Sequence, residues 1–372
     1  MVNFAVSDEQ VELRRSVRRF FGEKSGSADV RRAMESAEGY DEKTWQMMAE
    51  QLGVSGLAIP EEYGGSGYSY TELAVVFEEA GAALLCSPLF ASVALAANAL
   101  LESGDAEAKA AYLPGIAAGE RTATLAFTED DGRWEPDATT LAATRAGEEW
   151  RLSGHKSFVI DGHTADLILV VGRTDAGLGL FAVVSDAAGL ERRALPTLDQ
   201  TRKQARLTFA DTPARLVGDA GGAAAVVART LDLAAVALAA EATGGAQRCL
   251  DLAVQYAKER IQFGRPIGSF QAIKHKCSDM FLEVESARSA AYAAASEAAE
   301  GSPDLAAAAS LAKAYCTDAF FNTAAENIQI HGGIGFTWEH DAHLYFKRAK
   351  SSQLLLGDPT YHRERVAQYL GI

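Results

Sequence analysis

Two segments in the last third of the chain combine residue types that can hold a flat ligand carrying phosphate groups. The first spans residues 260–271 and reads RIQFGRPIGSFQ. Its arginines can pair with phosphate, its phenylalanines can pack against a flat ring, and its glycines let the backbone approach a ligand closely. The second spans residues 329–336, reads QIHGGIGF and does not follow a strand, so it is not a Rossmann dinucleotide fingerprint. Each segment taken alone is equally compatible with a helix connection or a helix cap.

Composition argues against several other kinds of site. The net charge of -15 speaks against a broad surface for nucleic acid or for an anionic membrane. The four cysteines form no CxxC pair, and their apolar contexts predict reduced thiols in the core. The seven histidines show no metal-ligand spacing, so we predict no metal site.

The sequence also lacks the usual signals of a membrane or secreted protein. Its Ala-rich apolar stretch at 233–240 is much shorter than the ~18–20 residues of a membrane-spanning helix, and Glu241 ends it. The first residues, MVNFAVSDEQ, have neither the basic start nor the apolar core of a signal peptide. We therefore expect a cytoplasmic protein with no membrane span.

Hydrophobic periodicity changes twice along the chain. Residues 1–118 are rich in helix formers, and Ser7 begins a helix with apolar residues at helical spacing. Residues 119–218 hold short β-rich runs separated by Gly, Asp and Pro, which predicts a mostly antiparallel barrel or sandwich. Residues 219–372 return to helical patterns, with helices expected at 223–261, 270–300, 304–331 and 359–369. The chain is therefore predicted to be an α+β protein with an N-terminal helical domain (1–118), a middle antiparallel β domain (119–218) and a C-terminal four-helix bundle (219–372).

Read together and in this order, the two ligand-binding candidates are much more specific. The stretches YAKERIQFGRPIGSFQAIKHKCSDM and ENIQIHGGIGFTWEHDAHLYFKRAK closely resemble the two C-terminal signatures of the acyl-CoA dehydrogenase family. LGVSGLAIPEEYGGSGYS is similar to the family's N-terminal loop, and AFTE and WRLSGHKSFVIDGHTADLILVVGRT are similar to its middle β domain. The resemblance covers nearly the whole chain, and the fold that it implies agrees with the periodicity.

The resemblance implies a specific chemistry. It implies FAD as cofactor, an acyl-CoA thioester as substrate, and α,β-dehydrogenation with an electron-transfer flavoprotein as electron acceptor. A carboxylate base removes the α-proton while a β-hydride passes to the flavin. Such a base must lie within hydrogen-bond reach of the α-carbon and have a raised pKa in a dry site. The resemblance also implies a homo- or hetero-tetramer in which two subunits share one FAD.

The FAD contacts carry over position by position. Arg260, Gln262 and Phe263 match residues that reach the diphosphate and adenosine of a neighbouring subunit's FAD, with Gln271, Gln329, Gly332 and Gly333 on the same adenosine side. Phe127 and Thr128 match residues of the β-domain strand that lies beside the flavin ring system. Phe158 and Ile160 match positions that flank the flavin, where many relatives have Trp and Thr.

The catalytic base is where this sequence departs from the family. Many relatives carry the base as a Glu that here corresponds to Leu356, and others carry it at the position of Ala234, so both usual places are apolar. Glu241 is our candidate for the catalytic base, because it lies on the face of Ala234 and its apolar surroundings would raise its pKa if it were buried. The alternative is that Glu241 is a structural acid inside the bundle. Asp358 is a further candidate, whereas Asp232 is expected to face elsewhere.

A second departure lies in the β domain. Where the family often has a small-residue loop, TEPGAGSD, this chain has TEDDGRWEPD at residues 128–137. The replacements are bulky and charged. The acids Glu129, Asp130 and Asp131 are expected to oppose an anionic CoA.

Both departures fall in the half of the site that handles substrate, while the segments that reach a neighbouring FAD are intact. This pattern resembles the non-catalytic subunit of heterotetrameric acyl-CoA dehydrogenases, including those that act on steroid side-chain CoA esters. Three alternatives remain: a self-sufficient homotetramer that uses Glu241, a flavin-binding scaffold, and a flavin monooxygenase on the same fold. The expected function is thus FAD-dependent dehydrogenation of an acyl-CoA in fatty acid or steroid degradation, as an enzyme or as a subunit of one.

Overall fold

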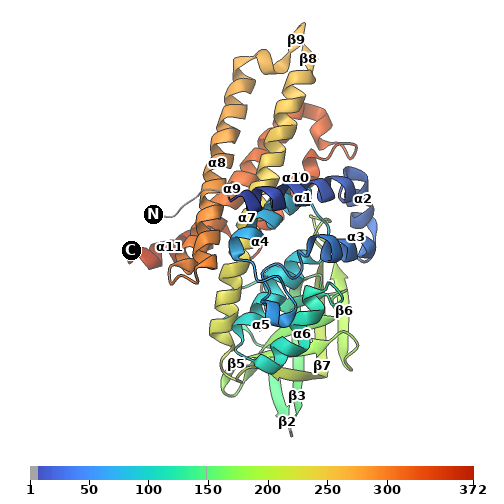
Figure 1. Ribbon diagram of the computed structural model, residues 1–372, viewed down its shortest axis with the longest axis vertical. Coiled ribbons are helices and arrows are strands. Elements are labelled where there is room, and N and C mark those ends of the chain that lie inside the picture. Colours follow the sequence, from blue (N-terminus) through green and yellow to red (C-terminus); the bar gives the residue numbers. More distant parts are fainter. Residues whose placement is uncertain (1–6, 148) are drawn as a thin grey trace. The chain divides into compact units, whose positions relative to one another are not determined.

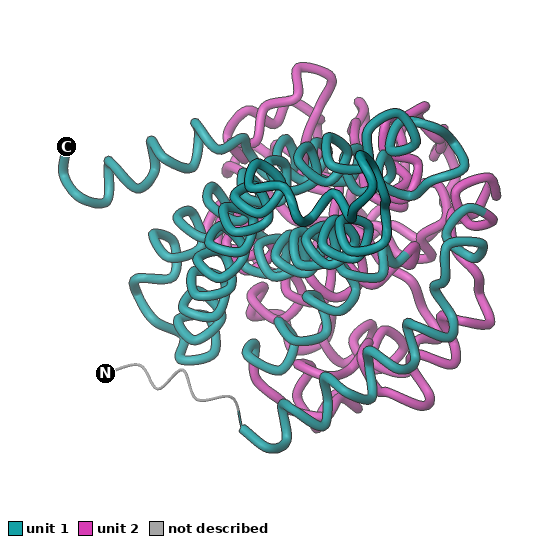
Figure 2. Tube along the Cα trace, turned by 90° about the horizontal axis from the view of Figure 1, so that it is seen from above, with its two compact units in different colours: residues 1–31, 70–85, 235–372 teal, residues 32–69, 86–234 magenta. Residues whose placement is uncertain are grey.

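A computed structural model of the chain describes residues 7–147 and 149–372. It forms two compact units (Figure 2). The first comprises the chain up to Arg31, Tyr70–Leu85 and Ala235–Ile372, and the second comprises Arg32–Ser69 and Cys86–Ala234. Each unit therefore combines stretches that are separate in the sequence. The three predicted domains, in contrast, are consecutive stretches of the chain.

The first unit is helical. Its helices are α1 (Asp8–Lys24), α4 (Tyr70–Ala82), α8 (Gln271–Ala299), α9 (Leu305–His331), α10 (Ala342–Leu354), α11 (Pro359–Leu370) and the later part of α7 (Ala223–Glu259). The four helices expected in residues 219–372 are all present, with ends within two residues of the prediction. Helix α10 was not foreseen. Helix α1 begins as expected, because Ser7 Oγ accepts from the Gln10 N–H and Gln10 Oε1 accepts from the Ser7 N–H, both at 3.1 Å.

Two glycines let α4 and α7 cross at close range. A Cβ atom on Gly244 would lie 1.7 Å from the Glu78 carbonyl oxygen, and one on Gly81 would lie 1.9 Å from the Glu241 carbonyl oxygen. Both contacts are with backbone, which cannot move aside as a flexible side chain can. The crossing therefore requires glycine at both positions.

We expect Gly244→Ala to lower the free energy of unfolding by about 2–3 kcal/mol, because the helices must separate to admit the methyl group. Urea unfolding followed by circular dichroism measures the change. Gly22→Ala in α1 is the matched control, since nothing lies within 4 Å of its Cβ position; it should be neutral or stabilise by about 0.5–1 kcal/mol. Equal stability of the two variants would contradict the close crossing.

The second unit is built on a β-barrel. Its strands are β1 (Ala123–Ala126), β2 (Ala142–Ala146), β3 (Glu149–Ile160), β4 (Leu167–Thr174), β5 (Gly177–Val184), β6 (Leu190–Leu195) and β7 (Gln204–Val217). Hydrogen-bonded pairs close the ring β4–β2–β3–β7–β5–β4, with β6 added beside β7. The pairing is mostly antiparallel, as predicted, and the exceptions are β1 with β4 and a single β2–β4 pair. Inward-facing Leu152, Ile168, Phe181 and Leu207 fill the core.

The shorter helices of the second unit come before these strands in the sequence. They are α3 (Glu42–Met47), α5 (Asn98–Glu102) and α6 (Ala106–Ala117), with π-helical turns at Met48–Leu52 and Phe90–Ala97, while α2 (Ser27–Glu35) spans the boundary between the units. The predicted fold class, helical at both ends with an antiparallel β region between, is confirmed.

Helix α7 bears on the expectation that the chain has no membrane-spanning helix. Among the described residues it is the one helix long and apolar enough to cross a bilayer, and 67% of its apolar window is buried inside the protein. The uninterrupted apolar stretch is short, but alanines on both sides extend the apolar character along the helix. Such burial is typical of the core helix of a globular domain.

Candidate functional site

A two-stranded hairpin joins α7 to α8 and carries the first group of predicted FAD contacts (Figure 1). Strands β8 (Ile261–Gln262) and β9 (Arg265–Pro266) pair antiparallel around Phe263 and Gly264, whose φ angles are 52° and 76°. A two-residue turn with both φ positive is the tight hairpin turn, and a phenylalanine is unusual there. The turn leaves the Phe263 ring 89% exposed, at a centroid distance of 5.9 Å from the ring of Phe270. Arg260 and Gln262 are exposed beside it.

The second group lies at the same end of the helices. Gln271 opens α8 and Gln329 lies in the last turn of α9, and both are exposed. An ion pair between Lys276 and Glu326 joins these two helix ends. The structure thus brings the seven predicted adenosine-side residues to one end of the helical unit.

The glycines after α9 leave room for a ligand. Gly332 ends the helix with φ 65°, and a Cβ atom on either Gly332 or Gly333 would meet nothing within 4 Å. The ring of His331 stacks on Tyr256 at a centroid distance of 4.3 Å and so fixes this turn against α7. Exposed guanidinium and amide donors, an exposed aromatic ring and open glycine backbone fit the diphosphate and adenosine of FAD.

The four predicted flavin neighbours of the β domain also lie close together, in the second unit. The Thr128 hydroxyl donates to the Ser157 carbonyl at 2.6 Å, and the Ser157 N–H donates to the Thr128 carbonyl at 3.0 Å. This bonding places the segment after β1 beside the end of β3. Phe158 has φ 59° and is 40% exposed, whereas Phe127, Thr128 and Ile160 are at most 8% exposed.

The acidic loop after β1 differs from expectation. Glu129 is buried and accepts hydrogen bonds from the Thr140 N–H, the Leu141 N–H and Lys156 Nζ at 2.8, 2.9 and 2.9 Å. Asp130 accepts from Arg206 at 2.8 Å and also binds the Ser157 hydroxyl. The prediction that both carboxylates oppose an anionic CoA is therefore wrong, because cations and donors of the same unit neutralise them.

These contacts shift the acid–base equilibria. Burial lowers the pKa of the fully buried Lys156 to about 8. Burial alone would raise the pKa of Glu129, but hydrogen bonds from Thr140 and Leu141 together with the charge of Lys156 lower it to about 2. Hydrogen bonds from Arg206 and Ser157 lower the pKa of Asp130 to about 2 as well. Both carboxylates are thus charged in the folded protein throughout the physiological range.

The Glu129 shift predicts an acid-sensitive β domain. Its folded pKa lies below its ordinary value of 4.5, so its stabilising contribution is present above that value and is lost as the pH falls toward about 2. We expect Glu129→Gln to destabilise the protein at neutral pH and to flatten its loss of stability in acid. Urea midpoints measured across this pH window show how steeply the stability of each variant changes with pH. Glu149→Gln, at an exposed carboxylate, should keep the wild-type slope, and an unchanged slope in Glu129→Gln would refute the assignment.

At the first usual base position, Leu356 is 4% exposed and has φ 62°. The turn that holds it is tightly anchored. Lys313 is fully buried and donates to the carbonyls of Gln353 at 2.8 Å and Gly357 at 2.5 Å. A nitrogen of His362 lies 2.9 Å from the Leu356 carbonyl. The turn is thus rigidly built, yet the side chain that it buries is a leucine.

The other candidate acids have different tasks. Asp358 Oδ1 accepts from the Tyr361 N–H at 2.8 Å, so this exposed carboxylate caps α11. Ala234, the second usual base position, is completely buried within α7. Asp232 is also buried, two residues earlier on the same helix.

Glu241 lies in a buried ion pair. Its Oε1 is 2.6 Å from Arg348 on α10, and the two side chains are 5% and 3% exposed. This pairing favours the alternative interpretation, a structural carboxylate that ties α7 to α10. Arg348 was missed as its partner, although a lone Glu among alanines needs a buried cation nearby. The signal was the KRAK stretch at 347–350, a cationic run that directly follows the apolar stretch LYF at 344–346.

We expect Glu241→Gln to lower the free energy of unfolding by about 3 kcal/mol, because it leaves the Arg348 charge uncompensated in the core. Chemical unfolding with a matched Glu364→Gln variant on exposed α11 as control measures the loss. If Glu241 were instead the base, the purified chain would turn over an acyl-CoA, and Glu241→Gln would abolish turnover at unchanged stability.

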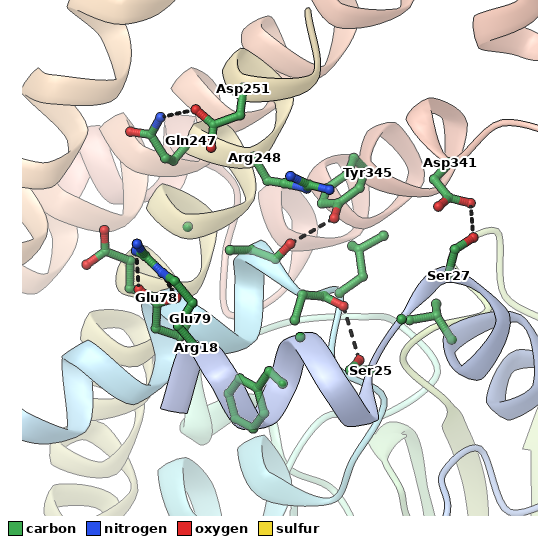
Figure 3. Close-up of a pocket in the computed structure, with 18 of the residues that line it drawn as sticks. Arg18, Ser25, Ser27, Glu78, Glu79, Gln247, Arg248, Asp251, Asp341 and Tyr345 are labelled. Carbon is green, nitrogen blue, oxygen red and sulfur yellow. Dashed lines mark hydrogen bonds and ion pairs between the residues drawn. The ribbon is translucent and has the colours of Figure 1, made fainter. Parts of the chain in front are cut away.

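A cavity of about 870 Å³ opens in the helical unit, and its described lining includes none of the predicted FAD contacts (Figure 3). In Figure 3 Arg18 reaches Glu79, and the Tyr345 hydroxyl donates to the Ala82 carbonyl at 2.8 Å. Among the described residues its lining has as many arginines as carboxylates: Arg14, Arg18, Arg248, Arg288, Glu78, Glu79, Asp251 and Asp341. The balance leaves no excess positive charge for a diphosphate, which favours the hairpin end as the cofactor site.

Comparison with known proteins identifies the class. Three domain families match in order: the N-terminal domain of acyl-CoA dehydrogenase at residues 7–120, its middle domain at 124–212 and its C-terminal domain at 221–371. Acyl-CoA dehydrogenase IpdE2 of Mycobacterium tuberculosis is 40% identical, over 95% of this chain and 94% of its own length.

Two solved structures share the whole fold. A variant of the Tcur3481–Tcur3483 steroid ACAD is 33% identical with a TM-score of 0.90, covering 99% of each chain. The ChsE4–ChsE5 complex from Mycobacterium tuberculosis is 27% identical with a TM-score of 0.91, covering 100% of this chain and 99% of that one. These matches confirm the predicted function class, FAD-dependent acyl-CoA dehydrogenation by an enzyme or a subunit of one. The chain belongs to the acyl-CoA dehydrogenase family.

Proposed function

We propose that this chain is the base-less subunit of a heteromeric acyl-CoA dehydrogenase, and that it completes the FAD site of a base-bearing partner. One observation carries the proposal: both usual base positions, Leu356 and Ala234, hold buried apolar side chains. The hairpin end, in contrast, keeps its exposed cofactor-binding residues. A leucine cannot accept a proton, so the α-proton is taken by a carboxylate of the partner.

The residues of the hairpin end bind and orient a cofactor rather than react. Arg260 pairs with a phosphate, Phe263 packs against the adenine, and Gln271 and Gln329 hold the polar edge of the adenosine. Gly332 and Gly333 allow the ligand to approach the backbone. When bound, FAD supplies the hydride acceptor of the reaction.

The names of relatives support a partner and a substrate class. The ChsE4–ChsE5 structure is called a complex, and the other structure is called a steroid ACAD under two joined names, Tcur3481 and Tcur3483. We accordingly assign a CoA ester with a steroid or fatty acyl group as the substrate of the complex. An electron-transfer flavoprotein is the expected acceptor, and the cytoplasm the expected location.

Co-expression with any acyl-CoA dehydrogenase that is encoded beside it tests the proposal. We expect a complex with equal numbers of the two chains. The purified single chain, mixed with FAD and an acyl-CoA, should not reduce the flavin. A lone chain that binds FAD stoichiometrically and turns over an acyl-CoA would contradict the proposal.

A further inference from the structure

The loop between β1 and β2, residues 129–141, is anchored firmly at both ends. At its start Glu129 is held by Lys156, and Asp130 by Arg206. At its end Arg173 donates to the carbonyls of Thr139 at 3.2 Å and Asp137 at 2.7 Å. The Glu129–Lys156 pair is buried, and the exposed charge-assisted hydrogen bonds from Arg206 and Arg173 add to it, so both ends of the loop are held in place.

This anchored loop lies on two of the residues assigned to the flavin ring. Trp134 packs on Phe127 with a centroid distance of 5.8 Å and an interplanar angle of 48°. Phe127 is consequently only 8% exposed. Further along, a Cβ atom on Gly132 would be 3.9 Å from the Phe158 ring, so the loop also borders that side chain. Trp134 therefore covers the Phe127 side of this surface, whereas the Phe158 ring at its border remains 40% exposed.

Two polar groups of this surface are already engaged in hydrogen bonds within the chain. A flavin ring carries nitrogen and oxygen atoms along one edge, and a binding surface must offer them hydrogen-bond partners. The Thr128 hydroxyl already donates to the Ser157 carbonyl. Ile160 is apolar and 3% exposed, and its carbonyl accepts from Thr124 at 2.6 Å. The β domain thus does not fit an isoalloxazine ring, although the hairpin end fits the adenosine diphosphate.

We infer that residues 129–141 form a fixed cover over this chain's own flavin-ring surface, with Trp134 as the residue that closes it. The inference rests on the proposed function and specifies it: in the complex, the flavin ring lies only against the partner's β domain. The chain consequently contributes one half of an FAD site, and the complex holds one FAD for every two chains.

Flavin content tests the cover. In the complex with the base-bearing partner, the double variant Trp134→Gly with Ile160→Thr should raise the FAD content from one per two chains toward one per chain. Arg133→Gly is the matched control, because Arg133 lies in the same loop with a 60% exposed side chain; it should leave the content unchanged. Flavin released by denaturation, divided by chain concentration, is the readout. One FAD per chain in the wild-type complex, or a folded double variant no richer in FAD than Arg133→Gly, would overturn the inference.

A second measurement does not depend on the variants. Amide hydrogen exchange of residues 129–141 should be the same in the wild-type complex before and after loading with FAD, whereas the hairpin should become protected. Protection of the loop on loading would overturn the cover. The proposed function fails by a different result, namely absence of a complex or an unprotected hairpin, so the two failures can be told apart.

Discussion

Replacing Arg260 and Phe263 of this chain together by alanine should weaken FAD binding by the complex about a hundredfold. A charge-assisted hydrogen bond to phosphate contributes roughly 1.5–3 kcal/mol and a ring contact roughly 0.5–1.5 kcal/mol, which together approach the roughly 3 kcal/mol of a hundredfold change. Fluorescence titration of the flavin-free complex with FAD measures the effect. The result is informative because the variant lies in one chain and the flavin ring is housed by the other.

The double variant should not disturb the fold. Phe263 is 89% exposed and Arg260 is also exposed, so neither supports the core. Arg15→Ala serves as control, since that side chain is 71% exposed on α1, outside the hairpin end. Wild-type FAD affinity in the double variant, at unchanged stability of the complex, would show that the hairpin does not bind the cofactor.

Replacing Lys156 by methionine should lower the free energy of unfolding by about 3–5 kcal/mol, because it leaves Glu129 buried without its cation. Lys156 Nζ also donates to the Phe127 carbonyl at 3.0 Å, so the methionine removes a bond to the segment that carries the predicted flavin neighbours. Urea unfolding measures the loss. Lys43→Met, at an exposed lysine of the same unit, should change stability by no more than about 0.5 kcal/mol.

A double variant separates charge from packing. Combining Lys156→Met with Glu129→Gln removes the unpaired charge but keeps a side-chain oxygen to accept from Thr140 and Leu141. The double variant should therefore be more stable than Lys156→Met alone. If the losses in free energy of unfolding of the two single variants simply add in the double variant, the ion pair is not what stabilises the loop.

Local patterns were enough to predict the helices and the hairpin end. Ser7 with Gln10 marks the start of α1, and the glycines after His331 mark the end of α9, because caps depend on neighbouring residues only. The exposed positions of Arg260 and Phe263 follow from a short turn between long helices. Features that depend on nearby residues could thus be read from the sequence.

Pairing over long distances could not be predicted. Glu129 meets Lys156 from another strand, and Glu241 meets Arg348 over a hundred residues later. From the sequence, the first looked like an exposed charge that repels CoA and the second like a candidate base. Whether a buried acid is a base or a structural group depends on the cation opposite it, and only the fold supplies that cation.

The turn at Leu356 is held in place by several contacts within the helical unit. Its left-handed backbone, its buried Lys313 and its contact with His362 hold a side chain inward. Burial lowers the pKa of Lys313 to about 7 and that of His362 to about 3, the latter also under the charge of Lys313. An unfavourable conformation persists only where its surroundings impose it, and here the contacts of Lys313 and His362 impose it.

The central claim is that proton abstraction does not depend on this chain. The most direct measurement is anaerobic bleaching of the flavin by acyl-CoA in three samples: the lone chain supplied with FAD, the wild-type complex, and a complex whose copy of this chain carries Asp358→Asn. The account predicts no bleaching in the first and equally fast bleaching in the other two. Bleaching by the lone chain, or its loss in the Asp358→Asn complex at unchanged FAD content, would contradict it.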